Sequence, residues 1–91
     1  MIDERIAKLE IDAALGDQKR QIFNDHIKPF IEAKERVLFE AFQNIHAQDI
    51  AKLQAIKMQQ TVLASLEAYF REYIDTGKLA KHELEKLNEN Q

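Results

Sequence analysis

The chain lacks cysteine and tryptophan, and it has only two glycines and one proline among 91 residues. The absence of cysteine excludes disulfides, catalytic thiolates and cysteine-ligated metal sites, and it fits a reducing compartment. Strands joined by tight turns need more glycine and proline than this. The stretch from Phe30 to Thr76 contains no glycine and no proline. The sequence therefore predicts an all-α fold built from long helices.

Other missing features narrow the class of protein. No apolar run approaches the roughly 20 residues that a membrane span needs, and the charged start Met1-Ile-Asp-Glu-Arg5 is unlike a signal peptide. We therefore expect a cytoplasmic or virion-associated protein that is neither secreted nor transmembrane. The net charge of −3 is spread evenly along the chain, so no basic half is available to bind phosphates. Nucleic acid is thus an unlikely partner.

Hydrophobic residues make up 45% of the chain and charged residues 32%, which is typical of a folded domain. A single helical domain over 1–91 is predicted, with three to four helices in a long-helix hairpin or small bundle. The predicted boundaries are an N-terminal helix at 1–15, a helix at 17–45 kinked near Pro29, a long helix at 49–75 and a short helix at 78–88. Gly16 and Thr76-Gly77 are interpreted as helix stops, and Pro29 as a kink or short break.

Two architectures differ in whether the chain turns between Ile45 and Asp49. Asn44 could end one helix and Asp49 could cap the next. The apolar stripes 31-38-42-45 and 56-63-70-74 nevertheless lie on one face of a continuous straight helix. The sequence permits a helical hairpin with a loop at 45–49 or a single rod, and it favours the hairpin because a compact core is easier to build that way.

Residues that could perform catalysis or bind metal do not converge. His46 and Asp49 are spaced i, i+3, but a metal site needs three or four ligands. His26 lies in a capping region before Pro29, and His82 lies among charged residues. Ser65 has no nearby histidine to activate it. Because Gly16 and Gly77 stand alone, there is no phosphate-binding loop either. We therefore predict no enzyme activity, no catalytic or metal-binding residues and no cofactor.

A small helical nucleic-acid-binding regulator is the alternative function. Lys19-Arg20 and the lysines at 78, 81 and 86 would supply its positive charge, and Tyr73 to Leu87 reads as helix, Thr76-Gly77, helix. The second of these helices is short, however, and it carries Glu83 and Glu85. This pattern is weaker than the one that indicates protein binding.

Large apolar and aromatic residues indicate a protein interface. In a hairpin, Phe30 would fall near Phe70 and Tyr73, whereas Phe39 and Tyr69 would point elsewhere. These two residues could pack loosely against the N-terminal helix, or they could contact another chain, because leftover apolar surface is usually an interface. Gln59 and Gln60 interrupt the apolar face. Gln60 could set the register of a self-associating coiled coil, or the two residues could be a solvated pair where the face rotates out of the core. The candidate interface residues are Ile31, Leu38, Phe39, Phe42, Ile56, Gln60, Leu63, Leu66, Tyr69, Phe70 and Tyr73.

The segment Ala68-Tyr-Phe-Arg-Glu-Tyr-Ile-Asp-Thr-Gly-Lys-Leu-Ala80 ends a helix with regularly spaced leucines. It resembles the C-terminal part of small helical accessory proteins of tailed bacteriophages, which are often involved in head assembly. The resemblance covers about a dozen residues and implies a virion or assembly protein without catalytic residues. Together with the amphipathic helices, it leads us to expect a non-enzymatic assembly or interaction module. Its partners would be proteins, including copies of itself in a homo-oligomer.

Overall fold

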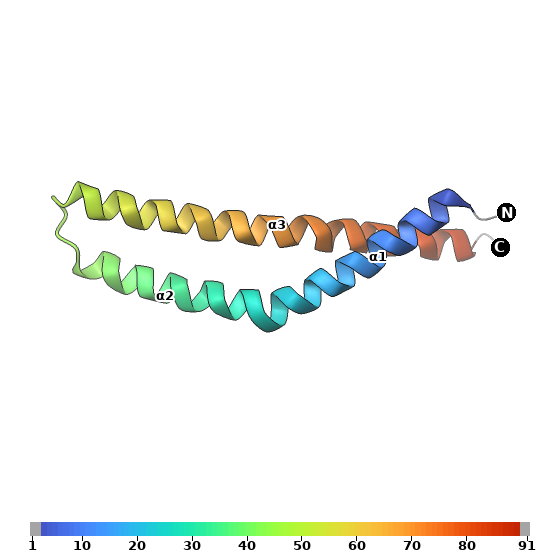
Figure 1. Ribbon diagram of the computed structural model, residues 1–91, viewed down its shortest axis with the longest axis horizontal. Helices are drawn as coiled ribbons and strands as arrows, with labels where there is room; N and C mark the ends of the chain where they lie inside the picture. Colours follow the sequence, from blue (N-terminus) through green and yellow to red (C-terminus); the bar gives the residue numbers. More distant parts are fainter. Residues whose placement is uncertain (1–2, 90–91) are drawn as a thin grey trace.

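The computed structural model describes residues 3–89, which are all-helical and contain no strand. The first arm consists of α1 (Glu4–Ile22), the π-helical turn η1 (Phe23–Ile27) and α2 (Lys28–Asn44). The second arm is α3 (Ile50–Glu89), and it runs back along the first. The result is an elongated hairpin with extents of 66 × 21 × 18 Å, in which the start of α1 and the end of α3 lie at the same end (Figure 1).

The chain turns where the hairpin interpretation placed the loop, so the single rod is wrong. The side chain of Asn44 donates to the Glu40 carbonyl at 3.0 Å as α2 ends, and Ile45 takes up an extended conformation. The Asp49 carboxylate then accepts from the Lys52 backbone N–H at 3.2 Å. This hydrogen bond satisfies one of the free donors at the start of α3.

Both predicted glycine stops are wrong, because α1 continues through Gly16 and α3 continues through Gly77. The predicted helices at 49–75 and 78–88 are therefore one helix, and the first helix does not end at residue 15. A Cβ built on Gly16 would lie 2.6 Å from the Cα of Gly77, and one built on Gly77 would lie 2.7 Å from the Cα of Gly16. The glycines allow the two backbones to touch at the helix crossing. Residues 1–2 of the predicted 1–15 helix lie outside the described residues.

The interruption expected near Pro29 takes the form of a π-helical turn and not of a chain break. The Lys28 backbone N–H donates to the Phe23 carbonyl five residues earlier, and the first arm bends at this place (Figure 1). Phe23 and Ile31 both face α3, but they are eight residues apart where a heptad repeat would have seven. The π turn accommodates the extra residue and so returns the apolar face of α2 to α3.

The core is one row of side chains between the two arms. Its buried members are Phe23, Ile31, Leu38, Ile56, Leu63 and Phe70. Those on α3 recur every seven residues, as in a coiled coil. Within residues 3–89, no large side chain is fully enclosed. Two helices alone therefore leave much of their circumference exposed.

Candidate interaction surfaces

The structure gives structural roles to several residues considered for chemistry. The Ser65 hydroxyl donates to the Thr61 carbonyl at 3.0 Å, which is a common backbone interaction of serine in helices. In the loop, Nδ1 of His46 accepts from the Gln48 backbone N–H at 3.3 Å. His26 and His82 are exposed on different elements. Residues 3–89 contain no group of three or more histidines and carboxylates placed to hold a metal ion.

In the span from Asp3 to Glu89, no helix is both long and apolar enough to cross a bilayer.

The predicted interface residues fall into two groups. Seven of them belong to the contact between the arms: Ile31, Leu38, Ile56, Leu63 and Phe70 are buried, and Leu66 and Tyr73 are half-buried. The exposed residues are Phe39, Phe42, Gln60 and Tyr69. The first group builds the hairpin itself, so only the second is free for contacts with another chain.

Phe23 is the aromatic core residue that the sequence reasoning missed. Its ring lies 5.9 Å from that of Phe70, in the place expected for Phe30. Phe30 instead lies half-exposed beside Lys34, whose Nζ is 5.9 Å from the centre of its ring. The spacing of eight residues between Phe23 and Ile31 could have identified Phe23 as a core residue. It exceeds a heptad by one residue, which shows that the apolar stripe shifts by one position before Pro29.

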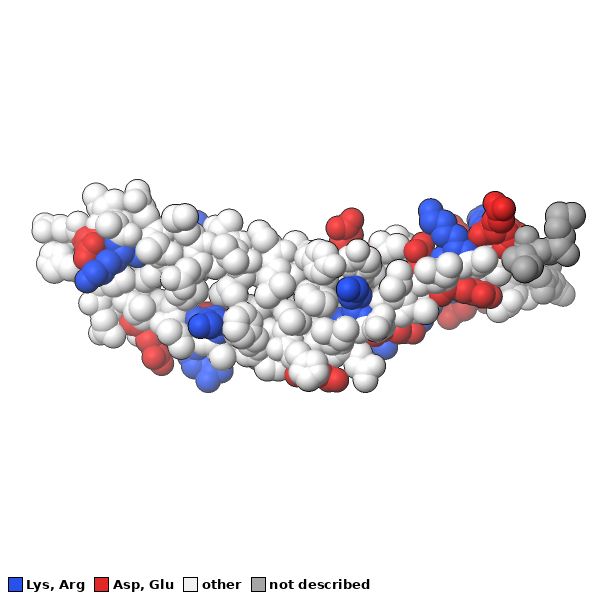
Figure 2. Space-filling view, viewed as in Figure 1, with Lys and Arg blue, Asp and Glu red and all other residues white. Residues whose placement is uncertain are grey.

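One side of the hairpin carries a largely apolar groove between α2 and α3, with a volume of about 400 Å³. Its lining residues are Phe30, Lys34, Met58, Gln59, Val62 and Leu66, with the buried Leu38 and Leu63 beneath them. We call this the loop-half groove. Lys34 is its one charged lining residue, and α3 has no carboxylate before Glu67. Over the middle of the face in Figure 2, few charged side chains are visible.

The same side continues toward the chain ends as a smaller groove of about 220 Å³, which we call the terminal-half groove. It lies on the same side of α3 because Tyr69 and Tyr73 follow Val62 and Leu66 by seven residues each. Its lining is more acidic and consists of Asp12, Leu15, Tyr69, Glu72, Tyr73 and Thr76. The two grooves together form what we call the apolar side.

Lys19 lies against the two tyrosines that line the terminal-half groove. Its Nζ is 5.1 Å from the ring centre of Tyr73 and 5.6 Å from that of Tyr69, a cation–π arrangement. The neighbouring Tyr69 hydroxyl raises the pKa of Tyr73. This cluster joins α1 to α3 and engages a lysine that the sequence offered as a phosphate contact.

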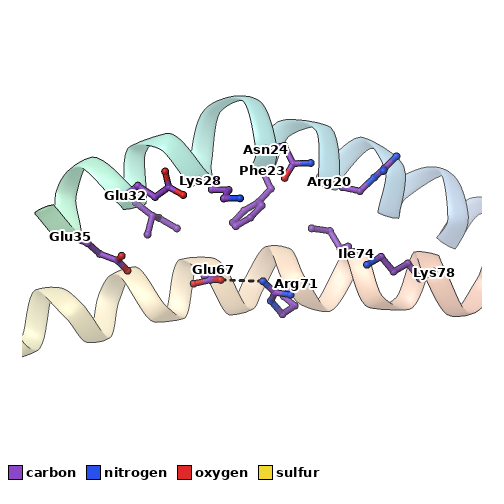
Figure 3. Close-up of a pocket in the computed structure, with 11 residues that line it drawn as sticks. Arg20, Phe23, Asn24, Lys28, Glu32, Glu35, Glu67, Arg71, Ile74 and Lys78 are labelled. Carbon is purple, nitrogen blue, oxygen red and sulfur yellow. Dashed lines mark hydrogen bonds and ion pairs between the residues drawn. The ribbon is translucent and has the colours of Figure 1, made fainter.

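The opposite side of the hairpin carries most of its charged lining residues at the bend. Glu67 and Ile74 lie one residue beyond Leu66 and Tyr73, which is about 100° further round α3. They contribute to a hollow of about 410 Å³ at the bend, where Glu32 and Glu35 lie toward the loop and Arg20 and Lys78 toward the chain ends (Figure 3). An ion pair of 3.2 Å joins Arg71 to Glu67 within it. The hairpin thus has two chemically different sides.

Ion pairs between the arms lie near the glycine crossing. Lys81 on α3 pairs with Asp17 on α1, and this hydrogen bond lowers the pKa of the Asp17 carboxyl. Arg5 pairs with Glu83 at 3.4 Å, and Arg20 also contacts Asp17 at 3.4 Å. All of these side chains are solvent-accessible, so they orient the helices more than they stabilise them.

Comparison of the chain with protein-family models, with curated proteins and with solved structures finds no match in any of the three.

Proposed function

We propose that this protein is a non-enzymatic assembly module that binds other protein chains, including copies of itself, through its helical faces. The observation that carries the proposal is the amount of surface left exposed. The chain exposes 7381 Å², whereas a compact monomer of its 10.6 kDa would expose about 5,500 Å². The difference of about 1,900 Å² exceeds the roughly 800 Å² that each partner buries in a standard interface.

The chemistry of that surface supports protein binding. Large apolar side chains are exposed on every helix, among them Ile11, Val37, Phe39, Met58 and Val62. Large apolar side chains exposed in such number commonly mark a protein interface. An enzyme would need converging polar groups, whereas the ion pairs described above lie at the solvent-accessible surface.

Mass measurement tests the proposal directly. Native mass spectrometry and light scattering at micromolar concentration should give a discrete oligomer, with a mass that is a whole multiple of 10.6 kDa. A strict monomer that also retains no protein in a pull-down experiment would contradict the assembly function.

A role as an accessory protein of a tailed-phage virion, or of its assembly, is a more specific form of the same proposal. Its support is the resemblance of residues 68–80 to such proteins. Neighbouring genes for head or tail structural proteins would strengthen it, and a neighbourhood of unrelated metabolic genes would count against it.

Nucleic-acid binding has weaker support than protein binding. Lys19 lies against aromatic rings, and both Arg20 and Lys81 contact Asp17. Because electrostatic attraction to phosphates is strongest at low salt, a mobility-shift experiment there with duplex DNA is the decisive test. We expect no shift.

A further inference from the structure

We propose that the apolar side is covered by a second copy of this chain in antiparallel orientation, so that two hairpins form a four-helix dimer about a two-fold axis. This inference rests on the proposed assembly function and deepens it, because it names the partner, the face and the orientation. Three observations carry it: the exposed area, the side of the molecule on which apolar residues lie, and the distribution of charge along the hairpin.

The exposed area suits a large partner. If each copy buried the roughly 1,900 Å² that it exposes beyond a compact monomer, the dimer would bury close to 4,000 Å² in total. Obligate homodimers commonly bury 2,000 to 5,000 Å². A face that extends along both arms of a 66 Å hairpin can supply such an area, whereas a short peptide would cover only part of it.

Residue spacing puts four exposed apolar residues on one side of the hairpin. On α3, Val62 and Tyr69 are one heptad apart, and on α2 the same holds for Phe30 and Val37. These four residues are exposed, and they flank the row of core residues on the side that carries both grooves. Two such surfaces facing each other would bury them in the usual core of a four-helix bundle.

The charge distribution selects the antiparallel orientation. Residues 28–66, the loop half, carry five basic and four acidic groups, a net of +1. The rest of the chain, the terminal half, carries eight basic and twelve acidic groups, a net of −4. A parallel dimer would place the two −4 halves together. The antiparallel dimer instead places each −4 half against a +1 half.

The two grooves show the same complementarity at the level of side chains. The loop-half groove has Lys34 as its one charged lining residue, and the terminal-half groove has the carboxylates of Asp12 and Glu72. In the antiparallel dimer, Lys34 of one copy approaches these carboxylates of the other. Opposite charges across an interface favour the correct orientation over others.

A matched pair of substitutions on α2 tests the face. Val37→Glu places a carboxylate on the apolar side, and Phe39→Glu places one two residues away, on the other side of the same helix. The two side chains are almost equally exposed, at 60% and 59%. We expect V37E to weaken dimerisation at least tenfold and F39E to leave it unchanged, as followed by light scattering. Val62→Glu on α3 should act like V37E.

Circular dichroism checks that each variant remains helical, and Val37, Phe39 and Val62 are exposed enough to accept a charge without unfolding the hairpin. If F39E dissociates the oligomer and V37E and V62E do not, assembly stands but the apolar side is the wrong face. A wild-type monomer would overturn both this inference and the self-association in the proposed function. A mass other than two chains would overturn the two-fold dimer alone.

Because the chain has no cysteine, single introduced cysteines can report the orientation. Spin labels at Gln48→Cys, in the loop, should be separated in the dimer by a distance comparable with the 66 Å length of the molecule. In a mixed dimer, a label at Gln48→Cys on one copy should lie close to a label at Asn88→Cys on the other. A short distance between two Gln48→Cys labels would show a parallel dimer and overturn the proposal.

Discussion

At the residue scale, the most restrictive feature is the pair of glycines at the helix crossing. Gly16 and Gly77 are each needed because the other is there, since a Cβ on either one would lie less than 3 Å from the opposite Cα. Neither glycine has a positive φ, so close approach and not backbone conformation explains the residue type. A helix made only for its own stability would have alanine at both positions.

Gly77→Ala should therefore destabilise the protein although alanine is the better helix former. Alanine in a helix is favoured by about 1 kcal/mol, but overpacking a tight contact costs about 1–3 kcal/mol. We expect the free energy of unfolding, measured in urea at fixed protein concentration, to fall. The control is Ala64→Gly, at an exposed position of the same helix. It measures the difference in helix propensity between alanine and glycine without any change in packing. A rise in stability for G77A would show that the helices do not touch there.

Acid should remove the contribution of Asp17 selectively. Its pKa is lowered in the folded state, chiefly by the hydrogen bond from Lys81, so its stabilising effect is present above the ordinary carboxyl pKa and is lost as the pH falls through the folded value. Asp17→Asn should thus lower the unfolding temperature slightly at pH 7. The difference from wild type should disappear when the pH is brought below the pKa of Asp17. A difference that persists there would mean that Lys81 is not the cause.

At the element scale, the π turn is an insertion that keeps two heptad registers in contact with one helix. Removing one residue from it should leave Phe23 and Ile31 seven residues apart, with both still facing α3. Pro29 would then lie in a regular α-helix, where its ring clashes with the preceding turn. We therefore expect deletion of His26 to be tolerated only when it is combined with Pro29→Ala.

Deletion of Ala33 is the matched control for that variant. It removes a residue from regular α-helix, so it should turn Leu38 and Ile45 by about 100° away from α3. Helical content by circular dichroism and unfolding in urea distinguish the two deletions. Equal stability of both variants would show that the register of α2 does not matter.

Much of this architecture follows from the sequence, but the continuation of α1 and α3 through their glycines does not. The turn after Asn44 could be predicted because Asn44 and Asp49 act locally as caps. The roles of Gly16 and Gly77 could not be predicted. In the sequence, a glycine that ends a helix cannot be distinguished from one that allows two helices to touch, because the residue opposite it is not known. Phe23 was missed for a similar reason, since its contact with Phe70 depends on the residue added by the π turn. Among the candidate interface residues, periodicity selected the core of the hairpin more reliably than its exposed surface.

At the scale of the whole molecule, the hairpin is extended and unevenly charged. Its radius of gyration is 19.6 Å, against about 12 Å for a compact domain of this length. The carboxylates gather toward the chain ends, and the apolar surface extends toward the loop. An elongated hairpin can bury much of this surface by packing side by side with another elongated molecule.

Lys34→Glu should weaken the dimer because it would place a third carboxylate near Asp12 and Glu72 of the other copy. We expect a loss of up to about thirtyfold in affinity at low salt, since the two-fold dimer has this contact twice and each exposed ion pair contributes up to about 1 kcal/mol. Lys57→Glu makes the same charge change on α3 at a residue that lines neither groove, and it should have little effect. Screening at high salt should reduce the difference between the two variants. Equal losses for both would indicate that net charge alone matters.

The hairpin also determines where attachments can be made. Because α1 begins and α3 ends at one pole (Figure 1), anything joined to either end of the chain is held at that pole, far from the loop. A single copy therefore offers attachment points at one pole only. In the antiparallel dimer, the chain ends of one copy would lie at one extremity and those of the other copy at the opposite extremity. The dimer would then act as a rigid spacer, and the length of α3 would set the distance between the groups attached at its two extremities.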